Sequence, residues 1–196
     1  MIASITLRRS IRKYKHSPVP RDLVEQVLEA GLLAPSSKNR QPWHFIVTTG
    51  RAKNEAVAAM KKGLLRERKT PFLPQSAPYI EDAFHTAEIM KEAPVLIFVM
   101  NELGCCLDHT LNRDERVSEI CNAQSIGAAV ENMCLAADSL GLGSLWICNT
   151  YFAYPELCQV LKSRGELVCA LTLGYAAEAP LKRPRKAFAD AVEFRE

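Results

Sequence analysis

The sequence lacks long hydrophobic runs, and this absence bears on where the protein works. Its 196 residues contain no apolar stretch of about 18 residues, the length that a membrane-spanning helix needs. The longest apolar run, residues 93–100, has the length of a strand. The N-terminus lacks the long apolar stretch that follows the basic residues of a secretory signal. We therefore expect a protein that neither spans a membrane nor carries a secretory signal.

The chain also lacks a strong net charge and the common motifs of side-chain catalysis. A net charge of +3 is too small to argue for nucleic-acid binding. No Walker A loop, no G-x-G-x-x-G and no G-x-S-x-G elbow occurs, and no pair of carboxylates stands out. We therefore expect a bound cofactor, rather than protein side chains, to supply the reactive chemistry.

Cysteine is not scarce, but its pattern argues against disulfides and against a metal site. The seven cysteines are an odd number, none forms a C-x-x-C motif, and most fall within apolar stretches. This usage favours reduced thiols in the cytoplasm. Cys105, Cys106 and His109 come closest to a cluster of metal ligands, but zinc sites in general use four well-spaced ligands. The sequence therefore predicts no metal site.

Apolar periodicity and the positions of proline predict one α+β domain over residues 1–196. Helices are expected over 4–11, 20–34, 52–68, 79–91, 119–140 and 154–164. Strands are expected over 43–49, 93–100, 141–148 and 166–176. Three prolines between residues 70 and 78 predict a surface loop or lid there.

The expected helix at 119–140 has apolar or small residues around most of its circumference. Its main stripe consists of Ile120, Ala123, Ile126, Val130, Met133, Cys134 and Ala137. One small domain cannot bury so much of a helix, and a large apolar patch is unusual on a monomer. We therefore expect an obligate homodimer that pairs through this helix.

A polar junction separates the helix at 20–34 from the strand at 43–49. Residues 33–47 read LAPSSKNRQPWHFIV, which holds more short polar side chains than a turn requires. Basic clusters stand near both ends of the chain, RRSIR at 8–12 and KRPRK at 182–186. Arginine forks match phosphate oxygens, so the junction and the two clusters predict a pocket for a phosphorylated, hydroxyl-rich cofactor. Trp43 is expected to pack in the core at the start of its strand.

Four motifs in this order resemble the FMN-dependent nitroreductase family. They are the Arg-x-Ser-x-Arg start, the APSSKNRQPW junction, the GLGSLWI segment and the C-terminal LGYAAEAPLKRPRK, which together span residues 8–186. The resemblance implies a nitroreductase-like mixed or antiparallel sheet flanked by helices. It also implies a homodimer that places its FMN sites at the interface between the two chains.

The resemblance implies a set of FMN contacts. The junction residues would bracket the flavin and its ribityl chain; they are Pro35, Ser36, Ser37, Asn39 and Gln41. Residues 146–148 would lie under the ring, and Arg12 beside its pyrimidine edge. The remaining contacts, at the phosphate and ribityl end, would be Arg8, Arg9, Ser10, Arg183, Arg185 and Lys186. The segment under the ring is Trp146, Ile147 and Cys148, and Cys148 departs from the family, whose members often have Gly or Glu there.

The activity implied is that of an FMN-dependent oxidoreductase. Hydride would pass from NADH or NADPH through FMN to nitroaromatics, quinones or similar electrophiles in a ping-pong cycle. One alternative is a family member with a different flavin role, namely flavin breakdown or dehalogenation. Another alternative is a basic-surface binding module for nucleic acid, which the low net charge and few aromatic residues disfavour. A flavin spectrum in the purified protein separates the flavoenzymes from that module.

Overall fold

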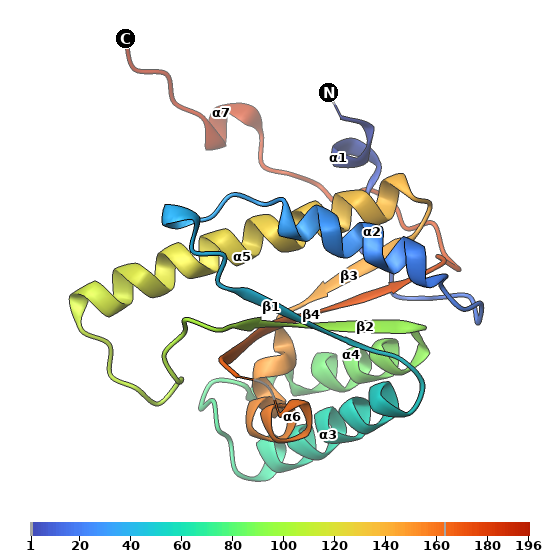
Figure 1. Ribbon diagram of the computed structural model, residues 1–196, viewed down its shortest axis with the longest axis vertical. Helices are drawn as coiled ribbons and strands as arrows, with labels where there is room; N and C mark the ends of the chain where they lie inside the picture. The colour runs from blue at the N-terminus through green and yellow to red at the C-terminus, as the bar shows by residue number, and fades with distance from the viewer. Residues whose placement is uncertain (1, 163) are drawn as a thin grey trace.

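A four-stranded antiparallel sheet forms the centre of the computed structural model, which describes residues 2–162 and 164–196 (Figure 1). The strand order is β1-β2-β4-β3. The strands are β1 (Trp43–Thr48), β2 (Val95–Asn101), β3 (Gly143–Ile147) and β4 (Glu166–Gly174). Every neighbouring pair is antiparallel, so the α+β class with a sheet flanked by helices is confirmed.

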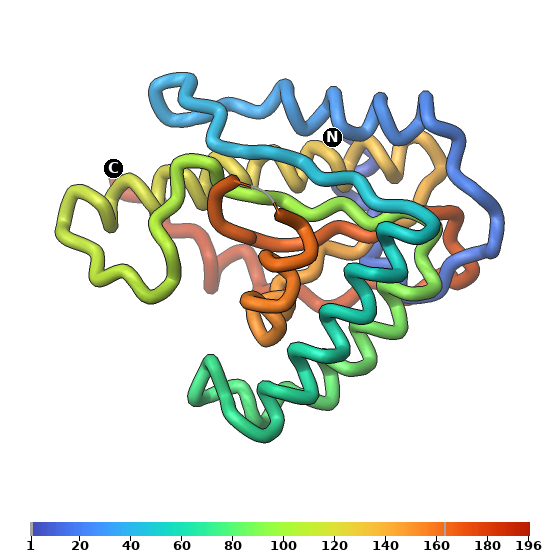
Figure 2. The backbone as a smooth tube through the Cα atoms, turned by 60° about the horizontal axis from the view of Figure 1, so that its bottom comes forward, coloured from blue at the N-terminus to red at the C-terminus, as the bar shows by residue number. Residues whose placement is uncertain are grey.

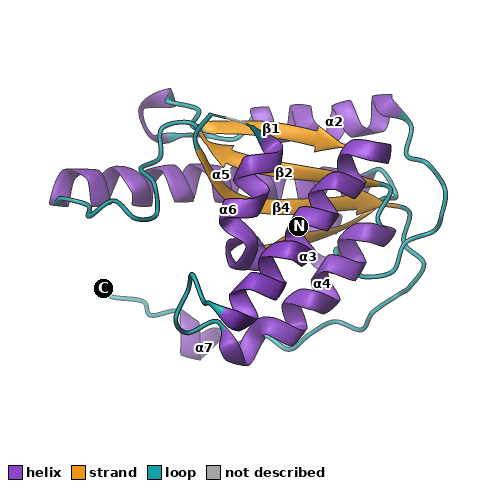
Figure 3. Ribbon diagram, turned by 90° about the horizontal axis from the view of Figure 1, so that it is seen from below, coloured by secondary structure: helices purple, strands orange, loops and turns teal. Residues whose placement is uncertain are grey.

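Two layers of helices cover the two faces of this sheet. One layer consists of α2 (Arg21–Leu32) and α5 (Arg113–Ser139), and the other consists of α3 (Gly50–Lys69), α4 (Ile80–Glu92) and α6 (Tyr154–Leu161). Figure 3 shows the second layer in front of the strands. Figure 2 shows α3 and α4 side by side, joined at the end far from the sheet by residues 70–79.

Strand β2 shows why both faces need a cover. All seven of its residues are buried. Val95, Ile97 and Val99 pack with the core on the side of α2 and α5. Leu96, Phe98 and Met100 pack with the core on the opposite side. Since side chains alternate along a strand, a run that is apolar at every position can be buried only between two layers.

A bulge in β4 changes the face on which its side chains point. The pairing with β2 shifts between Val99 and Met100, which leaves Val168 as an extra residue in β4. Leu167 therefore packs on the side of α3, while Cys169, also at an odd position, packs on the side of α5.

Short helical segments and the chain ends complete the fold. They are α1 (Ala3–Leu7), η1 (Ser37–Asn39), η2 (Ala77–Tyr79), η3 (Asn149–Ala153) and α7 (Phe188–Ala191). From residue 181 onward every residue is exposed, and this segment runs away from the sheet (Figure 1). In residues 2–162 and 164–196, no helix has the length and apolar character to cross a membrane.

The boundaries of two helices correct the sequence-based expectations. The long helix α5 begins at Arg113 rather than near residue 119, because Asn112 and Glu115 form a capping box at its start. The helix expected over 4–11 ends at Leu7, so the basic cluster that follows is extended chain. The apolar stripe of α5 is also shorter than expected, since Ile120 is 52% exposed and Ala123 is exposed as well.

Candidate functional site

The two basic clusters meet around one cavity of about 300 Å³, although they lie at opposite ends of the sequence. Its wall contains the end of α1, the segment after it and the segment 180–185. The residues of the sequence-predicted site that line it are Arg8, Arg9, Ser10, Arg12, Arg183 and Arg185. Lys182 lines it too, whereas Lys186 does not. Among the described residues no aspartate or glutamate lines this cavity, so its wall is strongly cationic.

Backbone pairing with the sheet fixes the first basic cluster in place. The N–H of Ile11 donates to the carbonyl of Ser144 on β3 at 2.9 Å. Further along, the N–H of Lys15 donates to the carbonyl of Tyr175 at 2.9 Å. The buried hydroxyl of Tyr14 lies 2.7 Å from that of Thr172 on β4. Arg12 is thus held by the backbone on both sides of it.

The arginines of the cavity differ in how much of their hydrogen-bonding capacity is already used. The guanidinium of Arg9 donates to the carbonyls of residues 6, 7 and 8 at 2.8–2.9 Å, which caps the end of α1. Arg8 forms an ion pair with Glu131 of α5 at 3.5 Å. The guanidinium of Arg12 donates to the carbonyl of Ser10 at 3.2 Å, and that of Arg185 donates to the carbonyls of residues 183 and 184 at 3.2 and 3.3 Å. Glu178 contacts Arg12 only at the backbone, where its Oε1 accepts from the N–H of Arg12 at 2.5 Å. In the described chain no ion pair involves the guanidinium of Arg12, Arg183 or Arg185. These three keep their charge available for an anion.

A second cavity, of about 410 Å³, adjoins the first and shares Arg12 and Arg183 with it. The end of β3 supplies Trp146, Ile147 and Cys148 to its wall, so the structure brings this predicted segment together with Arg12. Helix α4 supplies the opposite side with Asp82, His85, Thr86 and Ile89. These α4 residues were not predicted from the sequence, because a polar helix face without a motif is typical of solvent exposure.

A third cavity, of about 610 Å³, has mostly apolar and aromatic walls. It is lined by Leu73, Tyr79, Leu107, Tyr151 and Phe152, together with Asp82, Cys148 and Asn149, which it shares with the second cavity. Burial raises the pKa of Tyr151 to about 12, and partial desolvation raises the pKa of the Cys148 thiol. Both groups are therefore neutral at pH 7, and among the described residues Asp82 is the one charged side chain of this wall.

The polar junction lies apart from these three cavities. None of Pro35, Ser36, Ser37, Asn39 and Gln41 lines any of them. In Figure 1 the junction lies at one end of α2, above α5 and far from α1. The N–H of Ser37 donates to the hydroxyl of Ser125 on α5 at 3.3 Å, which attaches the junction to that helix. Within one chain, the structure does not bring the two halves of the predicted site together.

The junction has a strained backbone. Lys38, Asn39 and Gln41 adopt positive φ angles of 53°, 52° and 49°. This left-handed region is unfavourable for residues other than glycine and is tolerated best by Asn and Asp. The buried Nε of Arg40 has no hydrogen-bond partner in the described chain. Trp43, which follows, is 6% exposed and packs in the core as expected.

The cysteines differ in burial, although most of them fall within apolar stretches of the sequence. All seven are unpaired, but only Cys134 and Cys169 are buried. Burial raises the pKa of Cys134 to about 11 and raises the pKa of Cys169 as well, so both are neutral thiols. Cys106 and Cys148 are exposed, and the other three are half-buried.

Comparisons with known proteins find relatives that match most of this chain. A protein of Methanothermobacter thermautotrophicus, provisionally named NADH dehydrogenase/NAD(P)H nitroreductase, is 33% identical over 92% of this chain and 79% of its own. The 4-nitrobenzoate reductase of a Nocardioides strain is 28% identical over 86% of this chain and 77% of its own.

A solved structure extends this likeness to three dimensions. It is a provisionally named nitroreductase of Desulfovibrio desulfuricans in complex with FMN, with 26% identity and a TM-score of 0.73 over 99% of this chain and 95% of that one. The sequence profile of the nitroreductase family matches residues 5–175. The chain therefore belongs to the nitroreductase family.

Proposed function

We propose that this protein is an FMN-dependent oxidoreductase that takes hydride from NADH or NADPH and reduces nitroaromatics, quinones or similar electrophiles in a ping-pong cycle. The observation that carries the proposal is the pair of adjoining cavities that share Arg12 and Arg183. The names of the relatives, which include NAD(P)H nitroreductases and a 4-nitrobenzoate reductase, support the nicotinamide donor and the nitroaromatic acceptor.

The residues of the two cavities fit FMN. A dianionic phosphate fits the first cavity, because its wall holds several guanidinium groups and no described carboxylate. The ring fits the second cavity, where the end of β3 forms one wall and α4 the other. When bound there, FMN supplies the chemistry of accepting and donating hydride. Arg8, Ser10, Arg183 and Arg185 would hold the phosphate and ribityl end.

The chain's own residues then have separate tasks. Arg12 places a fixed cation in the second cavity and stabilises negative charge that develops there. Its backbone anchoring to the sheet keeps this charge in position before any reaction. The apolar cavity next to Cys148 binds a flat aromatic acceptor and excludes water from it. Asp82 on its wall repels an acceptor whose own carboxylate would lie beside it.

We further propose that the functional unit is a homodimer whose partner chain supplies the polar junction. Residues 35–41 line none of the three cavities of their own chain, so they reach a flavin only from another copy. Apolar side chains suited to such an interface are exposed on α5, where Val117 is 60% and Ile120 is 52% exposed. The seven unpaired cysteines support the expected compartment, the reducing cytoplasm.

Flavin binding by paired variants tests the cofactor site. Arg183→Ala removes a cation from both cavities and should weaken FMN binding about tenfold or more, since a hydrogen bond to a charged group contributes about 1.5–3 kcal/mol. Arg51→Ala removes an exposed cation of α3 and should leave the affinity unchanged. Fluorescence titration of the apoprotein with FMN measures both. Equal affinities, or selective binding of FAD, would contradict the proposed site.

Separate half-reactions distinguish the proposed activity from its alternatives. Anaerobic mixing with NADH or NADPH should bleach the flavin absorbance, and a nitroaromatic added afterwards should restore it. Parallel lines in a double-reciprocal plot are the expected sign of ping-pong turnover. Irreversible breakdown of the flavin would instead identify a flavin-degrading enzyme, and release of halide from a halogenated aromatic would identify a dehalogenase.

Charge placed on the exposed face of α5 tests the dimer. Ile120→Lys should yield monomers that lose FMN, because the side chain is exposed in one chain and would be desolvated in the pair. Val160→Lys on α6, where the exposed fraction is 38%, is the matched control and should stay dimeric. Val130 is unsuitable, since it is fully buried in the core of its own chain. Light scattering that finds a wild-type monomer with full FMN would refute the shared site.

A further inference from the structure

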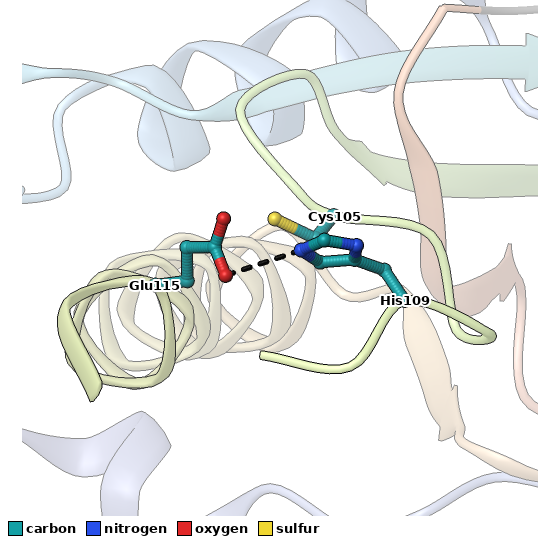
Figure 4. Close-up of side chains that lie close together, drawn as sticks. All are labelled: Cys105, His109 and Glu115. Atoms are coloured by element: carbon teal, nitrogen blue, oxygen red, sulfur yellow. Dashed lines mark hydrogen bonds and ion pairs between the residues drawn. The ribbon is translucent and has the colours of Figure 1, made fainter. Parts of the chain in front are cut away.

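The loop between β2 and α5 and the first turn of α5 bring a thiol, an imidazole and a carboxylate together. One ligand atom each of Cys105, His109 and Glu115 lies within 4.8 Å of the other two (Figure 4). The Nε2 of His109 is 3.1 Å from Oε2 of Glu115. Figure 4 shows the three side chains converging from the loop and from α5. They form a cluster outside the three cavities described above.

Hydrogen bonds of the backbone hold the cluster together. The N–H of Cys105 donates to Oε1 of Glu119 on α5 at 3.1 Å. A turn closes between Cys106 and His109, where the N–H of His109 donates to the carbonyl of Cys106 at 2.9 Å. The capping box fixes Glu115, whose Oε2 accepts from the N–H of Asn112 at 2.8 Å. The ligand atoms are thus positioned by the fold, as a preformed metal site requires.

We propose that Cys105, His109 and Glu115 bind a divalent transition metal of borderline softness, with Zn²⁺ as the best match. The sulfur, nitrogen and oxygen donors are the three ligand types that zinc takes in proteins. Three protein ligands leave one position of a tetrahedron for water. The exposed fractions of the His109 and Glu115 side chains, 45% and 34%, leave a path for the ion to enter.

The electrostatics of the cluster favour a cation. Partial burial and the negative charges of Glu119 and Glu115 raise the pKa of the Cys105 thiol. The same negative charges attract a divalent ion, and binding replaces the thiol proton. The hydrogen bonds from Asn112 and His109 lower the pKa of Glu115, so this carboxylate is charged at neutral pH.

An ion at this position would restrict one wall of the apolar cavity. Leu107, between the two loop ligands, lines the same cavity as Cys148 and Tyr151. A metal that joins Cys105 and His109 to α5 would fix this segment and hold Leu107 in place. This consequence rests on the proposed function, whereas the binding of the metal does not.

Zinc titration of the full-length, FMN-loaded protein tests the site without any measurement of turnover. Competition with a chromophoric chelator should give one Zn²⁺ for each chain, and Co²⁺ should produce a thiolate charge-transfer band. Cys105→Ser, His109→Gln and Glu115→Gln should each weaken Zn²⁺ binding by more than the roughly 10- to 100-fold lost with an outer-shell partner. Glu115→Gln is informative because glutamine still completes the capping box.

The neighbouring thiol supplies the matched control. Cys106→Ser removes an exposed sulfur outside the cluster and should leave both the affinity and the charge-transfer band unchanged. Circular dichroism confirms that each variant folds, and His109→Gln, on an exposed loop, remains decisive if Cys105→Ser does not fold. Binding that is absent in the wild type, or that is lost equally in Cys106→Ser, would overturn the proposal.

Discussion

The segment at 70–78 and the junction at 35–41 both connect a helix to the next element, but their polar groups are satisfied to different degrees. In the first, a single buried carboxylate organises the chain. Glu67, 1% exposed, accepts from the N–H of Phe72 at 2.6 Å and from the N–H of Leu73 and the hydroxyl of Ser76 at 2.8 Å each. It also pairs with Arg66. The segment is a surface loop, as expected, but it is anchored at three points.

The junction at 35–41 has weaker internal support. Its hydroxyl contact, from the N–H of Gln41 to Oγ of Ser36 at 3.0 Å, is exposed rather than buried. Three of its residues hold left-handed backbone conformations, although none of them is glycine. Such conformations cost on the order of 1–3 kcal/mol each and cluster at functional sites. The segment at 70–78 is held by a buried carboxylate, whereas the junction is held by exposed contacts, which include Nε2 of Gln41 donating to Oδ1 of Asn39 at 3.2 Å. The junction also keeps backbone strain that a flavin or a partner chain can use.

Removing the charge of Glu67 should produce the largest effect in this comparison. Glu67→Gln should lower the free energy of unfolding by roughly 3 kcal/mol, because it breaks a buried network and leaves donors without an anionic acceptor. Urea denaturation at pH 7 measures the loss. Glu81→Gln, which removes an exposed carboxylate beside Arg68, should change the stability by less than about 0.5 kcal/mol. Similar losses in the two variants would show that Glu67 does not anchor the loop.

The same variant should change how stability depends on pH. Burial alone raises the pKa of Glu67, but the hydrogen bonds from Leu73, Phe72, Ser76 and Arg66 outweigh it and lower the pKa below its usual value. A carboxylate whose pKa is lowered on folding contributes its full stabilisation above the pKa of the unfolded state, which is about 4.3 for Glu. This stabilisation is lost as the pH falls through the pKa of the folded state. The advantage of the wild type over Glu67→Gln should therefore shrink below about pH 4.3.

Substituting one serine in each segment should give stability losses of intermediate size. Ser76→Ala removes a buried hydrogen bond to a carboxylate and should cost about 1.5 kcal/mol. Ser36→Ala removes the exposed contact to Gln41 and should cost about 0.5 kcal/mol. Thermal and urea unfolding of both proteins measure the difference. An equal or larger loss in Ser36→Ala would mean that the junction is the better supported of the two segments.

The sheet and the two basic clusters were accessible from the sequence because each depends on local pattern. The apolar run at 93–100 predicts a strand buried on both faces, and β2 is such a strand. The arginines at both ends predict an anion site, and they line one cavity. The sequence pattern could not show which of these segments lie close together in space. The junction at 35–41 is as polar as a cofactor site requires, but it lies outside all three cavities.

Two other features were missed for physical reasons. Glu67 lies in a helix rich in lysine and arginine, where an acidic residue is expected to be exposed, and its burial depends on the loop that folds over it. The start of α5 at Arg113 was missed because its first turn is polar and carries no apolar stripe. The Asn112–Glu115 capping box was a usable signal. With it, Glu115 would have joined Cys105 and His109 as a candidate ligand.

The smallest expected change in stability comes from relieving backbone strain at two lysines, one inside the proposed flavin site and one outside it. Lys38 in the junction and Lys162 at the end of α6 both hold φ near 50°. Changing either to glycine relieves about 1 kcal/mol of backbone strain, part of which is offset by the greater freedom of glycine in the unfolded chain. Lys38→Gly and Lys162→Gly should therefore each stabilise the fold by roughly 0.5 kcal/mol, measured by urea unfolding of the FMN-free protein.

Flavin affinity should then distinguish the two positions. Lys38→Gly loosens a turn that we propose contacts FMN across the dimer, so it should weaken FMN binding severalfold while it stabilises the apoprotein. Lys162→Gly lies at the end of α6, where glycine is the preferred residue after a helix, and should leave the affinity unchanged. Fluorescence titration with FMN measures both variants. If Lys38→Gly gains stability and binds FMN as well as the wild type, the strain at 35–41 has no part in the site.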